Sequence, residues 1–216
     1  MKQFIQSKIN IFSLSILTVF TIIISVVYFQ FDKNTEQIKK YILENEIYKT
    51  SEYAQNISTM IKTHIKNNDI YEYLKKDVML RYRIEDKLSL FKSSKYIQIF
   101  VIRKDNKGKL RYLLDAETNL EERGFFNQKF DPQSTLWDKV FDSSIPEYTF
   151  QENIKDLWIT YLYPIKVNNK TVAILAFDFS SNEHTFVVNM INPIKSMFLY
   201  SSLILVIFLI YSYFQL

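Results

Sequence analysis

The chain carries two long apolar stretches, one near each end, separated by a polar and aromatic-rich region. Residues 9–31 and 196–216 contain no charged side chain. At about 1.5 Å of rise per residue, a helix of either length crosses a hydrocarbon core of roughly 30 Å. We therefore expect two transmembrane helices, a short cytoplasmic tail over residues 1–8, and one water-exposed domain over residues 32–195.

The far end of the first apolar stretch argues for an uncleaved anchor. A cleavage site would show small residues in an Ala-x-Ala pattern, whereas residues 26–30 read VVYFQ. The tail carries Lys2 and Lys8 without an acid, which places it in the cytoplasm and the central domain outside. The wealth of Lys, Ile, Asn, Tyr and Phe is typical of an AT-rich bacterial genome. These patterns predict a two-pass protein of the bacterial inner membrane.

Apolar and small residues recur at alternating steps of four and three in the first part of the central domain. The set is Leu43, Ile47, Thr50, Ala54, Ile57, Ile61 and His64. This spacing predicts one face of a long helix over about residues 34–66, continuous with the first span. The stripe would either pack on its own domain or pair with a second copy, giving a homodimer through the long helix. A second helical stretch is expected at residues 70–92.

The period changes to two after residue 95, where β-branched and aromatic residues dominate. Turn residues separate successive strands at 105–108 and at 167–170. We expect strands at residues 96–102, 109–114, 147–151, 157–165 and 171–179, and a short helix at 134–141. This order predicts an α+β domain built around a five-stranded antiparallel sheet.

Composition and motifs exclude several functions. The net charge of +4 is small, and basic and acidic residues are interspersed, so no nucleic-acid partner is expected. The chain has no Cys, which excludes disulfides and thiolate chemistry. It has no Gly-rich phosphate loop, no His-Glu-x-x-His motif, and no cyclase or kinase motif. We expect no enzymatic activity, no cofactor and no metal site, since His64 and His184 stand alone.

The arrangement resembles the Cache family of PAS-like extracytoplasmic sensor domains of bacterial membrane receptors. The resemblance rests on the long juxtamembrane helix, on YIQIFVIRKDNKGKLRYLLD at residues 96–115, and on LWITYLYPIKVNNKTVAILAFDFS at residues 157–180. The sequences LWITYLYPI and AFDFS are most similar to those of sensor regions that precede diguanylate cyclase (GGDEF) or histidine kinase modules. The resemblance implies a PAS-like fold, a small-molecule pocket on one face of the sheet, and a signal carried by the long helix.

Asp178 is the candidate ligand-binding residue that the resemblance singles out. Many amino-acid-binding Cache domains hold the ligand amine with an acid at the end of the last strand, and Asp178 matches that position. The Arg-x-Trp pair of those domains has no counterpart here, because residues 81–83 read Arg-Tyr-Arg. Asp178 also interrupts an apolar strand, and a buried acid needs a partner. The alternative is an acid that only caps the following turn.

Further candidates come from charged and tyrosine residues near the predicted sheet. They are Arg83, Arg111, Asp115, Tyr161 and Tyr163, which together would suit a small polar or anionic ligand. The alternative for each is a surface ion pair or a core aromatic residue. Trp137 and Trp158 are expected in the core.

Two function classes fit these observations. The first is a sensor that binds a small ligand outside the cytoplasm and signals through its transmembrane helices, as the input part of a diguanylate cyclase or histidine kinase. Because the sequence printed here contains no such module, the output would lie on a longer polypeptide or on a membrane partner. The second is an extracytoplasmic binding or assembly protein that does not switch.

Overall fold

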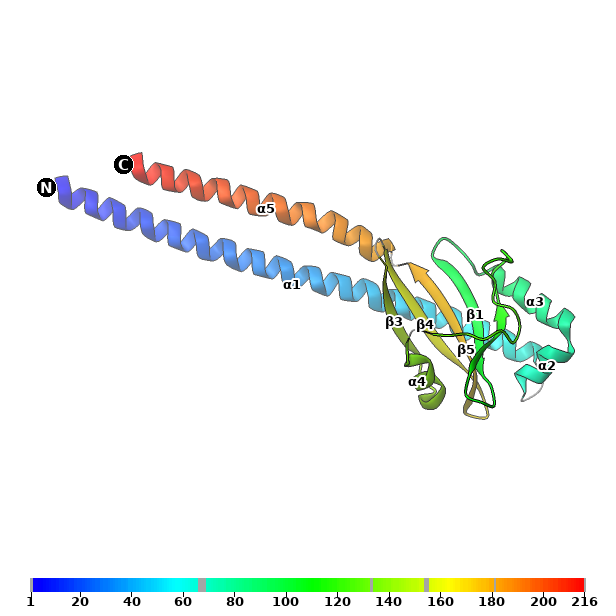
Figure 1. The fold of residues 1–216 in the computed structure, drawn as a ribbon. Coiled ribbons are helices and arrows are strands. Elements are labelled where there is room, and N and C mark those ends of the chain that lie inside the picture. Colours follow the sequence, from blue (N-terminus) through cyan, green and yellow to red (C-terminus); the bar gives the residue numbers. More distant parts are fainter. Residues whose placement is uncertain (1, 66–68, 133, 154–155, 181, 216) are drawn as a thin grey trace. The chain divides into compact units, whose positions relative to one another are not determined.

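The computed structural model describes residues 2–65, 69–132, 134–153, 156–180 and 182–215. The chain forms two compact units, one made of residues 1–42 and 183–216 and the other of residues 43–182. The elements are, in chain order, α1 (Lys2–His64), α2 (Ile70–Lys76), α3 (Val78–Ser89), β1 (Tyr96–Lys104), β2 (Leu110–Asp115), α4 (Leu136–Ser143), β3 (Glu147–Asn153), β4 (Asp156–Val167), β5 (Lys170–Ser180) and α5 (Asn182–Gln215) (Figure 1).

The helix α1 is a single helix of 63 residues, as the sequence predicted, and contains no Gly or Pro to break it. Its periodic stripe packs on the sheet of the second unit, since Ala54, Ile57 and Ile61 are fully buried. Pairing with a second copy stays a prediction. It would have to use the exposed side of α1, where the side chain of Tyr48 is 63% exposed.

The predicted helix at residues 70–92 is two helices, α2 and α3, that meet at Asp77. The backbone of Asp77 is non-helical, with φ −106° and ψ 83°, and its carboxylate accepts a hydrogen bond from the N–H of Leu80 at 2.8 Å. Asp69 caps α2 in the same way through the N–H of Glu72, at 3.1 Å. An aspartate in this role satisfies a free N–H of the first turn, so it begins a new helix where apolar periodicity alone predicts continuation.

The five strands form one antiparallel sheet in the order β2-β1-β5-β4-β3. The β4–β5 hairpin closes through Asn168 and Asn169, both with positive φ, of 49° and 61°. A two-residue turn of this kind matches the twist of the flanking strands, and Asn tolerates it well. The predicted strands and the predicted sheet are therefore confirmed.

Both faces of the sheet are covered. On one face, α1, α2 and α3 pack over a cluster that includes Ile99, Leu175 and Phe177. On the other face, α4 packs over a smaller cluster that includes Phe100 and Trp137. Trp137 is 4% exposed, so its predicted core position is confirmed. The side chain of Trp158 lies outside the described residues, as does that of His184.

Three register shifts interrupt the strand pairing. One lies between β1 and β5, where Tyr96 pairs with Phe179 and Gln98 with Asp178, which leaves Ile97 as an extra residue. Across β1 and β2, Val101 pairs with Leu114 and Ile102 with Tyr112, which leaves Leu113 as an extra residue. Across β4 and β5 the extra residue is Val172. Strict alternation along residues 171–179 would put Val172 on the same face as Asp178, but because of this β-bulge it joins the cluster beneath α1.

The unit that holds α5 contains the apolar helix expected near the C-terminus. Within the part of the chain that the structure describes, one stretch, Asn189–Phe208, is long and apolar enough to cross a membrane, and none of it is buried in the protein. In the same unit Lys195 forms an ion pair with Asp32 of α1, and its ammonium nitrogen lies 5.0 Å from the centre of the Tyr28 ring. The span predicted at residues 9–31 stays a prediction.

Candidate functional site

Asp178 lies on the face of the sheet that α4 covers, between Gln98 of β1 and Thr160 of β4. The Thr160 hydroxyl donates a hydrogen bond of 2.6 Å to its carboxylate. Among the described residues, no Lys or Arg forms an ion pair with Asp178. Burial raises the pKa of this carboxyl to about 6, and the bond from Thr160 opposes part of that rise. The site therefore holds a half-buried acid that pairs with no cation in the described part of the chain.

Aromatic rings adjoin the acid on this face. Phe100 follows Gln98 on the same side of β1 and contacts the rings of Tyr112, Phe130 and Trp137, with centroid separations of 5.6 to 6.0 Å. Burial, and then the carboxylates of Asp115 and Asp178, raise the pKa of Tyr112 to about 12. An acid beside several aromatic rings favours an organic cation, which both groups attract. We call Asp178, Thr160 and Tyr112 the Asp178 site.

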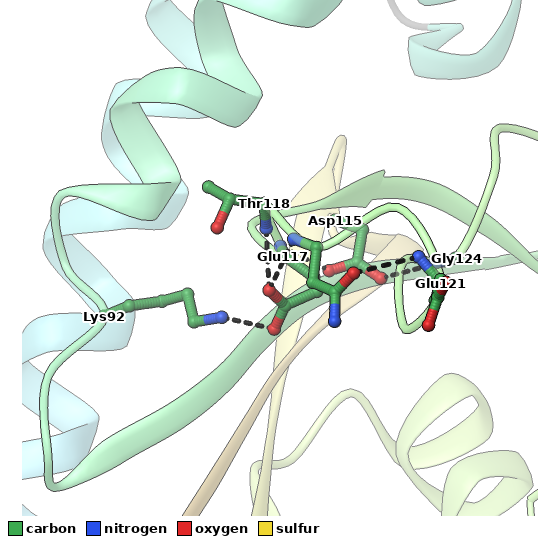
Figure 2. A network of polar contacts seen from close by, with 7 residues as sticks. Lys92, Asp115, Glu117, Thr118, Glu121 and Gly124 are labelled. Atoms are coloured by element: carbon green, nitrogen blue, oxygen red, sulfur yellow. Dashed lines mark hydrogen bonds and ion pairs between the residues drawn. The ribbon is translucent and has the colours of Figure 1, made fainter.

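Asp115 organises a loop. Its two carboxylate oxygens accept hydrogen bonds from the backbone N–H groups of Glu117, at 2.8 Å, and Gly124, at 2.7 Å (Figure 2). Glu117 binds the N–H groups of the next two residues and forms an ion pair with Lys92 (Figure 2). Asp115 is 6% exposed, and burial raises its pKa despite these bonds. Its charge therefore holds the loop against the sheet beside Tyr112.

Arg111 lies at the other end of β2 and does not meet Asp178. Its Nε donates to Asp105 at 2.6 Å and its Nη1 to the Asn127 carbonyl at 3.0 Å. The Arg111 guanidinium, followed by the backbone N–H of Lys109, holds the pKa of Asp105 at about 2. Arg111 therefore pairs with Asp105 and is not a partner of Asp178.

The remaining sequence candidates lie elsewhere. Tyr161 is 3% exposed on the face beneath α1, where its hydroxyl bonds Ser51. Tyr163 packs against the same cluster. Arg83 is exposed on α3. A ligand at the Asp178 site would therefore contact none of these three residues, and a ligand role for them stays a prediction about other surfaces.

Besides Thr160, sequence reasoning missed Tyr112 as a residue of the Asp178 site. Tyr112 lies in the YLL run between Arg111 and Asp115, where it looks like one more apolar strand residue. The signal that could have found it is Gly124, one of two Gly in the chain. A Cβ on Gly124 would lie 2.5 Å from the Tyr112 ring, so only glycine lets the loop approach this closely.

Comparison with known proteins gives structural neighbours but no sequence family. No family model and no curated protein matches the chain. Solved structures with a similar arrangement include sensor and ligand-binding domains of bacterial proteins. One is the ligand-binding domain of the Campylobacter jejuni chemoreceptor Tlp3 in complex with 4-methylisoleucine, with 13% identity and a TM-score of 0.46 over 74% of this chain and 63% of that one.

Two further neighbours are domains of other kinds of bacterial protein. The sensor domain of the Vibrio cholerae histidine kinase DctB shows 13% identity and a TM-score of 0.45, covering 71% of this chain and 58% of that one. The periplasmic domain of Chlamydia trachomatis RsbU shows 17% identity and a TM-score of 0.36, covering 73% and 59%. This chain thus spans about three fifths of the length of these solved domains. Similarity this distant transfers no ligand, partner or residue role.

Proposed function

We propose that this chain is a membrane-anchored sensor whose α+β domain binds a small molecule that carries a protonated amine. The observation that carries the proposal is Asp178, a half-buried carboxylate that lacks a protein cation among the described residues and lies next to a group of aromatic rings. A ligand amine would supply the missing charge, and the rings would contact the apolar part of the ligand. We assign the chain no catalytic step of its own.

The proposed signal passes from the domain to the membrane through the helices. The helix α1 contributes to the core beneath the sheet and continues without a break into the segment predicted to span the bilayer. A ligand that binds one state of the domain better would shift that helix between two positions. The output module, a diguanylate cyclase or a histidine kinase, would lie on the same polypeptide or on a partner, and the domain outside the inner membrane.

The test of ligand class uses the full chain in detergent micelles. A panel of small primary and quaternary amines is compared, by thermal unfolding, with neutral molecules of the same shape. We expect at least one amine to raise the unfolding temperature, and Asp178→Asn to weaken its binding ten- to a hundredfold, the value of a charge-assisted contact. Asp86→Asn, the same change on an exposed acid of α3, serves as the control. Equal binding by both variants would contradict the assignment.

Switching is tested separately from binding. Cysteines replace Asp32 and Lys195, which form an ion pair between α1 and α5, and the rate of disulfide formation is measured with and without the amine that binds. A sensor should change this rate, because its signal moves one helix relative to the other. Binding without any change in rate would favour the non-switching scaffold.

A further inference from the structure

A cleft lies at the end of the sheet where the β1–β2 hairpin turns. Its volume is about 910 Å³, within the range of small-molecule sites. The residues that give it its chemistry are Tyr71 from α2, Arg103 and Arg111 from β1 and β2, and Asn127 from the loop. Arg103 lies five positions along β1 from Gln98, the neighbour of Asp178, a distance of roughly 17 Å along the strand. We call it the Arg103 cleft, and it is distinct from the Asp178 site.

The guanidinium of Arg103 is the least compensated charge in this cleft. Its central carbon lies 3.7 Å from the centre of the Tyr71 ring, and its Nη2 donates to the Asn127 side-chain oxygen at 2.7 Å. Its Nε is buried without a hydrogen-bond partner, and in the described ranges no carboxylate forms an ion pair with it. A guanidinium carries five N–H donors, and a covered charge without a counter-ion is costly. The arrangement therefore calls for an anion.

A second guanidinium stands beside the first. Arg103 and Arg111 are direct cross-strand partners. Asn127 joins them, because its side-chain oxygen accepts from Arg103 and its backbone oxygen accepts from Arg111 at 3.0 Å. Asn127 has φ 67°, a conformation that Asn adopts more readily than most residues. Asp105 already forms an ion pair with Arg111, so Arg103 is the member of this pair of arginines that an anion would neutralise.

The opposite lining of the cleft limits what the anion can be. Asp69, Glu72 and Asp142 also line it. These acids would repel a polyanion, whereas hydroxyl or amine groups of a small ligand can donate to them. The cleft thus fits a molecule with one anionic group at the arginine end and polar donors at the other.

We propose that the Arg103 cleft binds a small polar molecule through a carboxylate or phosphate group that pairs with the guanidinium of Arg103, beside that of Arg111. A guanidinium held by stacking on an aromatic ring presents its edge in a fixed direction, which suits two parallel hydrogen bonds to such a group. The domain would then carry two ligand sites of opposite charge, on opposite faces of one sheet.

The structure offers a matched control for Arg103. Tyr71 stacks on Phe126, with centroids 5.5 Å apart and the rings 7° from parallel, and Arg81 covers the far side of Phe126 at 4.4 Å. Arg103 and Arg81 therefore close the two ends of one stack. Both lose a charge and a cation–π contact on change to Gln, but only Arg103 lines the cleft. Equal effects of Arg103→Gln and Arg81→Gln on anion affinity would show that Arg103 acts only through the ring stack and not as a ligand-binding residue.

The experiment titrates the full chain, in micelles of a detergent without phosphate, with inorganic phosphate and separately with lactate at constant ionic strength. We expect saturable stabilisation by one of the two at millimolar concentration, which also tells phosphate from carboxylate recognition. Arg103→Gln should weaken that binding ten- to a hundredfold, and Arg81→Gln should leave it unchanged. If the Gln variant does not fold, Arg103→Lys decides, because it keeps the charge but loses the fork and should bind several-fold more weakly.

Two results would overturn the proposal. One is the absence of saturable stabilisation of the wild-type chain by either anion. The other is an equal loss of affinity in Arg81→Gln and Arg103→Gln. Asp178→Asn should keep the affinity for the anion, because Asp178 lies on the other face of the sheet; loss of anion binding in that variant would contradict two separate sites.

Discussion

At the scale of single residues, the chain uses acids in opposite ways. Asp77 and Asp115 satisfy backbone N–H groups, and Asp105 neutralises Arg111. Asp115 has two N–H donors, Asp105 has a cation, and Asp77 caps the first turn of α3, so the structure explains each charge. Asp178 has one hydroxyl donor among the contacts described here, from Thr160. It is therefore the acid whose environment least favours its ionised form, as the rise in its pKa shows.

The raised pKa of Asp178 predicts how the unliganded protein responds to pH. An acid whose pKa is about 6 when folded and 3.8 in its ordinary state binds its proton more tightly in the folded state. The free energy of unfolding should thus fall as pH rises from about 4 to about 6, by at most about 3 kcal/mol, and stay lower above that range.

The measurement is urea unfolding at several pH values for the wild-type chain and for Asp178→Asn. The amide stays neutral, so this contribution should be missing from the variant. Glu85 and Asp115, whose pKa values burial also raises, contribute equally to both proteins and cancel in the difference. Parallel curves for the two proteins would contradict the prediction.

At the scale of elements, the loop between β2 and α4 depends on one close approach. Gly124 donates its N–H to Asp115, and the ring of Tyr112 lies where a Cβ on Gly124 would be. The ring cannot move aside freely, because it contacts Phe100 and Phe130 at centroid distances of 5.7 and 5.3 Å. The loop, the strand and the aromatic cluster therefore fix one another.

Gly124→Ala should lower the free energy of unfolding by about 1 to 3 kcal/mol, since the added methyl group would lie 2.5 Å from the Tyr112 ring. Tyr112→Leu should relieve the clash, so the double variant should lose less stability than the sum of the two single changes. Urea unfolding of the three variants measures this coupling. Strict additivity would show that the ring and the glycine do not compete for space.

The helices and strands were largely predictable from the sequence, but the face of the sheet that each strand residue occupies was not. Periods of 3.6 and 2, together with the turns at Gly108 and Asn168, located the strands and α1. Because both faces of the sheet are covered, the strands read as continuous apolar runs, and alternation could not say which side Asp178 occupies. The bulge moved Val172 alone to the other face, while Ile174 and Ala176 stay on one face as alternation predicts. The sequence analysis missed Arg103 as a candidate binding residue, because what marks it is its contacts with Tyr71 and Asn127, which are distant in sequence.

At the scale of the whole molecule, the two compact units differ in whether their apolar residues are buried by protein. All members of the two core clusters lie between Ala54 and Phe179. The stretch Asn189–Phe208 of α5 is uncovered by protein and contributes to neither cluster. The core of the central domain therefore needs neither apolar end of the chain.

We predict that the fragment of residues 33–195 folds in water as a single cooperative unit. Its thermal unfolding, followed by circular dichroism, should show one transition, because both clusters are complete within it. Ile57→Asp, which places a charge where the side chain is fully buried, should abolish that transition and so confirm that it reports the core. A fragment that stays soluble only in detergent would contradict a self-sufficient domain.

The bulges at Leu113 and Val172 also decide where this sheet can change length during evolution. Leu113 and Val172 are extra residues without a cross-strand partner. The residues before and after each of them therefore face the same sides of the sheet as they would in a strand that lacked the extra residue. Deleting one of them would remove a side chain yet leave Arg111 and Asp178 on their present faces. A deletion elsewhere in these strands would turn every residue beyond it to the other face. Lineages of this domain should therefore differ by single-residue gaps at these two positions and at Ile97, the extra residue between β1 and β5, and keep the other strand positions in strict register.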